Sequence, residues 1–174
     1  YETPKDISLK EKTQTITLGD YKNEPSVSSD EDVSIVTDEN VNDSFDTKLA
    51  NADELYKSKK YAEAADIYNE LLKSAEDNQK PYIYNQLASI SLKSKNYKKA
   101  KEYYLSAIVI IKQNNITGKE VVNAYSGLAY CFEKEGKKDS AIKNYKKAME
   151  LSTSASTKQK LQKAIDRLSG AGNE

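Results

Sequence analysis

The residues of this sequence that could carry out chemistry are few, and their types exclude most kinds of catalytic site. Cys131 is the only cysteine and histidine is absent, so the commonest general base and the commonest neutral metal ligand are both missing. Without a base beside it, we expect the Cys131 thiol to be buried and structural rather than nucleophilic. The acidic stretch 28–34 lacks the glycine and the spacing of a calcium loop, so we interpret it as solvated charge. We therefore predict a protein that is not an enzyme and that has no metal or cofactor.

Charge is unevenly distributed along the sequence, although the total is balanced. Residues 1–45 contain 4 Lys against 11 Asp and Glu, whereas the remaining residues contain 23 Lys and Arg against 16 Asp and Glu. The low hydrophobicity and high charge of residues 1–44 favour a largely disordered, solubilising tail or linker. The alternative is that this acidic tail docks within the chain or mediates self-association. Arg167 is the only arginine, so bidentate recognition of phosphates or base edges is disfavoured and we expect no nucleic-acid binding.

The compartment of the protein stays open at this point. No apolar run approaches the roughly 20 residues that a membrane-spanning helix needs, and the longest, residues 107–111, is far shorter. The sequence begins at Tyr1 and its only methionine is Met149, so we expect a segment to precede it. That expectation fits a processed periplasmic or lipid-anchored bacterial protein, and it fits a shortened cytoplasmic protein equally well.

The elements that must position any functional residue are predicted to be helices. Within residues 1–44, only the alternating stretches 13–18 and 33–37 could form strands, and they would need a neighbouring edge. Ser44 or Asp46 can then cap the first of a series of helices. No strand pattern competes beyond that point, so the fold class is all-α. The predicted helices are 46–58, 61–76, 81–94, 97–113, 119–135, 139–151 and 156–169.

Three stretches of the helical region share one spacing of small and aromatic residues. Ala64, Ala100 and Ala141 lie 36 and 41 residues apart, and each is followed four residues later by a tyrosine. A small residue recurs in each preceding helix as well. Self-similarity with such a period is typical of repeat architectures. The tyrosines are Tyr68, Tyr104 and Tyr145, and the upstream small residues are Ala52, Ala88 and Ala129.

This pattern resembles the tetratricopeptide repeat (TPR) family, whose unit of about 34 residues is a helix-turn-helix. The resemblance implies a TPR-type α-solenoid over residues 45–170, with repeats at about 45–80, 81–121 and 122–155 and a capping helix at 156–169. It implies that the paired alanines let two helices approach closely and that the tyrosines fill the space before the next pair. The longer second period implies an extended second helix or a larger loop around residues 114–119.

In this family the first helices of successive repeats line a concave groove that binds peptide or protein segments. Asn and Gln side chains both donate and accept hydrogen bonds, which suits an extended backbone, and tyrosines give large contact areas. The alternative is a solvated concave surface without a ligand. The resemblance assigns eleven residues to the groove: Leu49, Asp53, Tyr56, Tyr82, Asn85, Gln86, Ser89, Asn123, Ser126, Tyr130 and Glu133.

The predicted function is therefore non-catalytic binding of a protein or peptide segment, as an adaptor or assembly factor. One TPR subset grips the C-terminal carboxylate of chaperone tails with Lys, Asn and Arg. Its positions map to Leu49, Asp53, Gln86, Asn123 and Gly127, which include no cation, so we expect no such clamp. The alternative function is a structural, self-associating module in which the tail or a neighbouring chain occupies the groove.

Overall fold

The computed structural model describes residues 44–170 of the 174-residue chain. The predicted acidic tail, its two candidate strands and its proposed self-association fall on residues 1–44, which apart from Ser44 lie outside the described residues. Within the described part there are seven helices and no strand. The predicted all-α class is thereby confirmed. None of these helices is both long and apolar enough to cross a membrane.

Six of the seven predicted helices begin and end within one residue of the observed bounds. The exception is α2, which was predicted to reach residue 76 and ends at Leu71. There the amide of Ala75 donates to the Leu71 carbonyl at 2.8 Å and the chain turns, which carries Ala75 into the core. The helices are α1 (Phe45–Lys57), α2 (Tyr61–Leu71), α3 (Lys80–Lys93), α4 (Tyr97–Gln113), α5 (Lys119–Lys134), α6 (Lys138–Leu151) and α7 (Ala155–Ser169).

Local sequence signals account for the outer ends of the helical series. The Ser44 hydroxyl accepts a hydrogen bond from the amide of Thr47 at 3.3 Å, so Ser44 is the cap of α1. At the other end, Gly170 adopts a left-handed φ of 77° after α7, which is the usual conformation of a glycine C-cap. Inside each repeat the tight turn needs one left-handed residue, and it falls at equivalent places on Lys59, Lys95 and Gly136.

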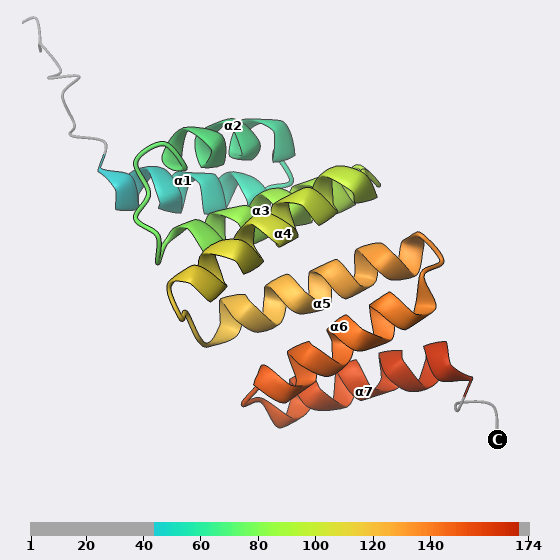
Figure 1. The fold of residues 1–174 in the computed structure, drawn as a ribbon. Coiled ribbons are helices and arrows are strands. Elements are labelled where there is room, and N and C mark those ends of the chain that lie inside the picture. Colours follow the sequence, from blue (N-terminus) through green and yellow to red (C-terminus); the bar gives the residue numbers. More distant parts are fainter. Residues whose placement is uncertain (1–43, 171–174) are drawn as a thin grey trace, which may run out of the picture. The chain divides into compact units, whose positions relative to one another are not determined.

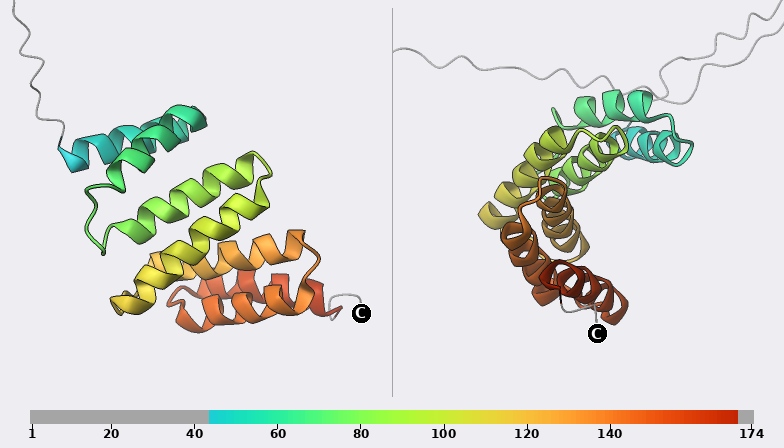
Figure 2. Two further views of the ribbon diagram at one scale, coloured as in Figure 1. Left: turned by 45° about the horizontal axis from the view of Figure 1, so that its top comes forward. Right: turned by 90° about the vertical axis from the view of Figure 1, so that its right-hand side faces the viewer.

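The helices pack as successive antiparallel pairs, α1 with α2, α3 with α4 and α5 with α6, and α7 packs on α6 (Figure 1). In the right-hand view of Figure 2, α2, α4 and α6 follow the outer side of a curved stack, and α1, α3 and α5 follow its inner side. The inner helices α3 and α5 also contact each other directly. This arrangement makes the first helix of each repeat the natural site for a concave surface.

The core confirms the predicted roles of the repeated alanines and tyrosines. The six alanines of the repeat are all fully buried, and each predicted pair lies in one hydrophobic cluster. Small side chains here allow the backbones of paired helices to approach closely. Tyr68, Tyr104 and Tyr145 are also buried, and each packs with apolar side chains of the next helix pair or of α7. The extra residues of the second period are found in α4, which has 17 residues against 11 in α2 and 14 in α6.

Candidate peptide-binding groove

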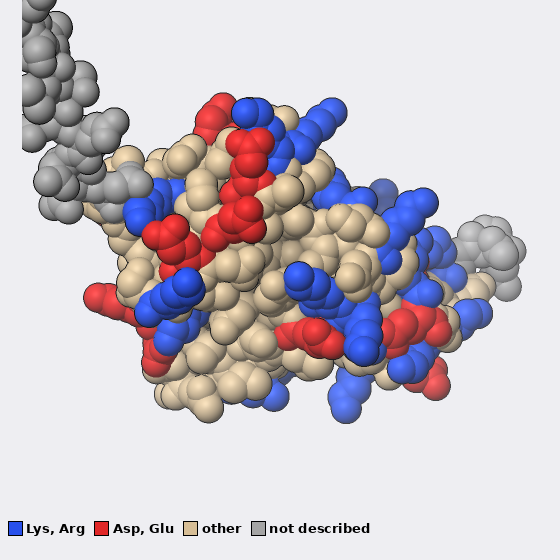
Figure 3. Space-filling view, turned by 90° about the horizontal axis from the view of Figure 1, so that it is seen from above, with Lys and Arg blue, Asp and Glu red and all other residues tan. Residues whose placement is uncertain are grey.

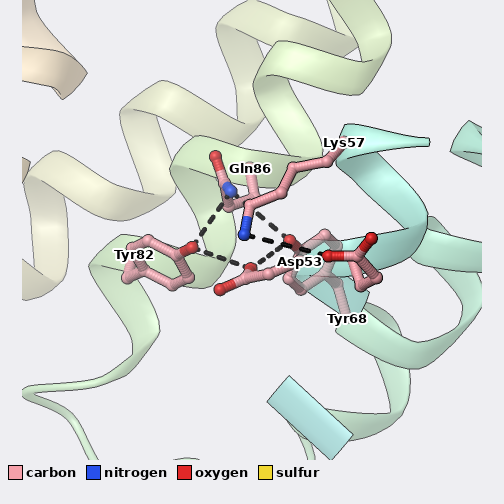
Figure 4. A network of polar contacts seen from close by, with 6 residues as sticks. Asp53, Lys57, Tyr68, Tyr82 and Gln86 are labelled. Atoms are coloured by element: carbon pink, nitrogen blue, oxygen red, sulfur yellow. Dashed lines mark hydrogen bonds and ion pairs between the residues drawn. The ribbon is translucent and has the colours of Figure 1, made fainter. Parts of the chain in front are cut away.

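Polar side chains of α1 and α3 meet in one hydrogen-bonded network at the N-terminal end of the concave side. One carboxylate oxygen of Asp53 accepts hydrogen bonds from the hydroxyls of Tyr68 at 2.5 Å and Tyr82 at 2.7 Å. The amide of Gln86 donates to the same two hydroxyls, at 3.3 and 3.1 Å. Figure 4 shows the Lys57 side chain reaching over this network. The half-buried carboxylate of α1 is thus held in place by donors from α2 and α3.

Burial and the Asp53 carboxylate together raise the pKa of the Tyr68 and Tyr82 hydroxyls well above the ordinary value. Desolvation disfavours the phenolate, and a nearby negative charge disfavours it further. Both hydroxyls therefore remain protonated donors at any physiological pH. The network is a fixed arrangement of dipoles around one carboxylate, and it contains no group poised to transfer a proton.

Next to this network, α3 and α5 enclose a polar cavity of about 270 Å³. Five of the eleven predicted groove residues line it. Two further lining residues were not predicted for the groove, Tyr104 from α4 and Gly127 from α5. The five predicted residues are Asn85, Gln86, Ser89, Asn123 and Ser126.

The Tyr104 ring reaches this cavity because Gly127 leaves room for it. A Cβ atom built at residue 127 would overlap the tip of the Tyr104 ring. Tyr104 is 6% exposed, and its hydroxyl has no hydrogen-bond partner among the described residues. Burial raises its pKa, so the hydroxyl is a protonated group with an unused donor at the wall of a polar cavity.

Asn85 connects α3 to the start of α5 at the floor of the same region. Its amide nitrogen donates to the Glu120 carbonyl at 3.0 Å and to the Glu120 carboxylate at 2.8 Å. Asn123 approaches that carboxylate at 3.5 Å. The side-chain carbonyl of Asn85 is buried and unpaired, and turning the amide over would place this oxygen against the carboxylate. Asn85 was predicted to face a ligand, and it is 95% buried as a link between repeats.

The remaining predicted groove residues have separate surroundings. The hydroxyl of Tyr56 is paired with that of Ser89 at 2.7 Å, and Leu49 packs half-buried against the first core cluster. Tyr130 is exposed and contacts the Tyr97 ring edge-on. Each of these side chains still lies on one of the helices of the inner side.

Glu133 forms a polar junction of α5, α6 and α7. Its carboxylate accepts two hydrogen bonds from the Arg167 guanidinium, at 2.8 and 3.1 Å, and one from the Tyr145 hydroxyl at 3.0 Å. These donors, Arg167 first, lower the pKa of Glu133. A carboxylate with three protein donors has little capacity left for a ligand, so the capping helix uses this side chain.

The described residues offer no arrangement suited to covalent chemistry or metal binding. Cys131 is fully buried, as predicted, and burial raises the pKa of its thiol to about 11, which keeps it protonated and unreactive. Within residues 44–170, no three His, Cys, Asp or Glu side chains gather closely enough to hold a metal ion. What the concave side offers is hydrogen-bond donors and acceptors around a cavity.

Comparison with known proteins agrees with the repeat pattern. A family model described as tetratricopeptide repeat matches residues 80–154, and no curated protein sequence matches the chain. The chain is similar in fold to the TPR2AB domain of yeast Sti1 in complex with pHSP90, with 20% identity and a TM-score of 0.63 over 73% of this chain and 48% of that one. It therefore spans about half of that structure.

Two further structures are similar over nearly their whole length. The Arabidopsis OM64 TPR domain has 20% identity and a TM-score of 0.58 over 71% of this chain and 94% of that one. The type III secretion chaperone SycD of Yersinia enterocolitica, in complex with a peptide of the translocator YopD, has 18% identity and a TM-score of 0.60 over 74% and 92%. With these matches, residues 80–154 belong to the tetratricopeptide repeat family, and the described part of the chain, with its three registered helix pairs, is an all-α solenoid of that type.

Proposed function

We propose that this protein is an interaction module that binds an extended segment of a protein partner along α1, α3 and α5. The observation that carries the proposal is the polar cavity between α3 and α5, lined by amide and hydroxyl side chains and by the unpaired Tyr104 hydroxyl. Such groups can pair with the backbone of an extended peptide in either direction. The similar SycD and Sti1 structures contain a YopD peptide and pHSP90 respectively, which supports a peptide as the ligand class.

The charges on the concave side argue against a free C-terminal carboxylate as the bound group. The side chains nearest the cavity include the carboxylates of Asp53 and Glu120, and no Lys or Arg lines the cavity. An anionic terminus brought beside these carboxylates would be repelled. We therefore propose that the segment is internal to its partner or carries neutral side chains at this point.

A peptide-display selection on the full chain, followed by fluorescence polarisation of the selected peptides, tests this proposal. Replacing Ser126 by Arg puts a long side chain into the cavity while keeping a good helix former at a half-buried position. We expect it to weaken peptide binding by about tenfold or more, corresponding to about 1.4 kcal/mol. Helical circular dichroism should be unchanged.

Ser106 provides the matched control. It is also a half-buried helical serine whose hydroxyl donates to a carbonyl of the preceding turn, in this case that of Glu102 at 3.1 Å, but it does not line the cavity. S106R should leave peptide binding within about twofold. Equal losses in S126R and S106R, or full binding in S126R, would show that the selected peptides bind elsewhere and would refute the groove proposal.

A further inference from the structure

A second and larger cavity lies on the opposite side of α5 from the groove. It has a volume of about 570 Å³ and is bordered by the end of α4 and by α6. Tyr125 and Phe132 form its floor. They are seven residues apart, which is about two helical turns, and they are offset by about 200° from Asn123 and Tyr130 on the groove side. The two cavities therefore cannot share one ligand segment.

The floor of this outer cavity is aromatic and firmly held. Tyr125 and Phe132 are half-buried, and both pack against the two core clusters on either side of α5. The ammonium groups of Lys101 and Lys137 lie 5.6 and 5.9 Å from the centre of the Phe132 ring. Such cation–π contacts help to hold the ring in position. The floor thus presents rigid apolar surface beside positive charge.

The rim of the outer cavity is positively charged. Lys147 is paired with Glu150 at 3.0 Å, whereas Lys112, Lys143 and Lys146 have no ion pair within residues 44–170. All three are exposed. Three unpaired ammonium groups around one cavity repel each other and would gain from a negatively charged neighbour.

The charge of the surrounding repeats reinforces this local pattern. Residues 81–170 contain 17 Lys and Arg against 7 Asp and Glu, whereas residues 44–80 contain 6 Lys against 8 Asp and Glu. Figure 3 shows one face on which Asp and Glu form a band towards the upper left while Lys and Arg gather towards the right. The second and third repeats with α7 are therefore the basic part of the helical region.

We propose that the outer cavity binds an acidic segment of a protein partner, with an apolar side chain inserted over Tyr125 and Phe132 and flanking carboxylates paired with Lys112, Lys143 and Lys146. Contact with the aromatic floor buries the apolar surface that provides affinity, and charge complementarity selects the segment and accelerates its association. A nucleic acid fits less well, because the rim has no arginine that could pair bidentately with phosphates or base edges.

The test uses the full chain and a short fluorescein-labelled peptide in which a Leu-Phe pair is flanked on both sides by Asp and Glu. Fluorescence polarisation should show binding that weakens steeply as salt is raised. The triple variant K112E/K143E/K146E should weaken it by about tenfold or more. The matched control is K158E/K160E/K163E, which changes the net charge equally through exposed lysines of α7 that lie outside the cavity, and it should lose less than about threefold.

One peptide change and one groove change complete the design. Replacing the Leu-Phe pair by Ala-Ala should abolish most of the binding, because the floor then has no apolar partner. S126R, which fills the groove cavity, should leave it unchanged, so this inference can fail or hold independently of the groove proposal. Equal losses in the two triple variants, full binding of the Ala-Ala peptide, or equal competition by a single-stranded DNA of the same charge would each overturn the proposal.

Discussion

Tyr68, Tyr104 and Tyr145 occupy the same place in three successive repeats, but their hydroxyls have different surroundings. Tyr68 donates to Asp53 and Tyr145 donates to Glu133, each on the first helix of its own repeat. Tyr104 is buried to a similar degree as the other two, and its hydroxyl is unpaired at the wall of a cavity. A hydroxyl that lines a cavity without a protein partner contributes no stabilising hydrogen bond, so the middle repeat lacks a contact that the outer two have.

The residues that repeat show how this difference arises. The position of Asp53 in the first repeat corresponds to Ser89 in the second, and the Ser89 hydroxyl is already paired with Tyr56. No carboxylate is left for Tyr104, and Gly127 opens the space into which its ring extends. The hydroxyls of Tyr68 and Tyr145 therefore stabilise the solenoid, whereas the hydroxyl of Tyr104 is available to a ligand. The following predictions test this division, from the largest expected effect to the smallest.

Gly127→Ala should be the most damaging of the single changes considered. The added methyl group lies well inside van der Waals distance of the buried Tyr104 ring, so we take the upper end of the range of about 1–3 kcal/mol for overpacking, less the roughly 1 kcal/mol gained from helix propensity. We expect the free energy of unfolding, measured by urea denaturation, to fall by about 2 kcal/mol. Adding Tyr104→Leu to this variant should restore part of the loss, because the ring is then absent. If the double variant is no more stable than Gly127→Ala, the overlap is not the cause.

Tyr68→Phe should be the most costly of the three possible tyrosine-to-phenylalanine changes. The change leaves the half-buried Asp53 carboxylate with one of its two tyrosine donors. Loss of a hydrogen bond to a charged acceptor costs about 1.5–3 kcal/mol, and we expect the lower end of that range because Tyr82 still donates to the carboxylate. Urea denaturation of the variant and of Tyr104→Phe, side by side, gives the comparison directly. Equal stability of the two variants would refute the distinction between the outer and middle tyrosines.

Glu133→Gln should destabilise the protein by about 1 kcal/mol at neutral pH and have a smaller effect in acid. Its donors hold the folded-state pKa of Glu133 below the ordinary value. A depressed carboxyl pKa contributes stability above the unfolded-state pKa of about 4.3, and this is lost as the pH falls through the folded-state value. The difference between the urea midpoints of wild type and E133Q should therefore be smaller at pH 3 than at pH 7. A constant difference would mean that the charge of Glu133 is not what holds α7.

Tyr104→Phe should leave stability within about 0.5 kcal/mol of wild type, because the hydroxyl has no protein partner to lose. Peptides selected on the groove should nevertheless bind the variant less well. Urea denaturation and fluorescence polarisation on the same preparation separate the two effects. A clear loss of stability without a loss of peptide binding would assign the hydroxyl to the fold.

The sequence was sufficient for the architecture because the repeated residues are the ones that hold it together. Ala64 and Tyr68 recur with neighbours that have the same roles, so periodicity located the repeats and the resemblance to the TPR family supplied the contacts between their helices. The early end of α2 escaped prediction, since residues 72–76 have good helix propensity and only the burial of Ala75 requires the turn.

The candidate sites were less predictable than the fold. Asn85 was predicted as a ligand contact from its place on the helix, but whether an amide faces a ligand or a carboxylate 35 residues away depends on tertiary structure. The sequence could not show that Tyr104 and Gly127 line the cavity, because this depends on how closely the Tyr104 ring approaches residue 127 in the folded protein. The outer cavity depends on the spacing of α4 and α6, which no local pattern encodes.

The left-handed turn inside each repeat has a consequence for engineering. Gly136 adopts this conformation without a side-chain penalty, whereas Lys59 and Lys95 adopt it at a cost of about 1–2 kcal/mol each. Both lysines are exposed and line neither cavity. Replacing either lysine by glycine or asparagine should therefore increase the free energy of unfolding without altering either surface on which a partner would bind.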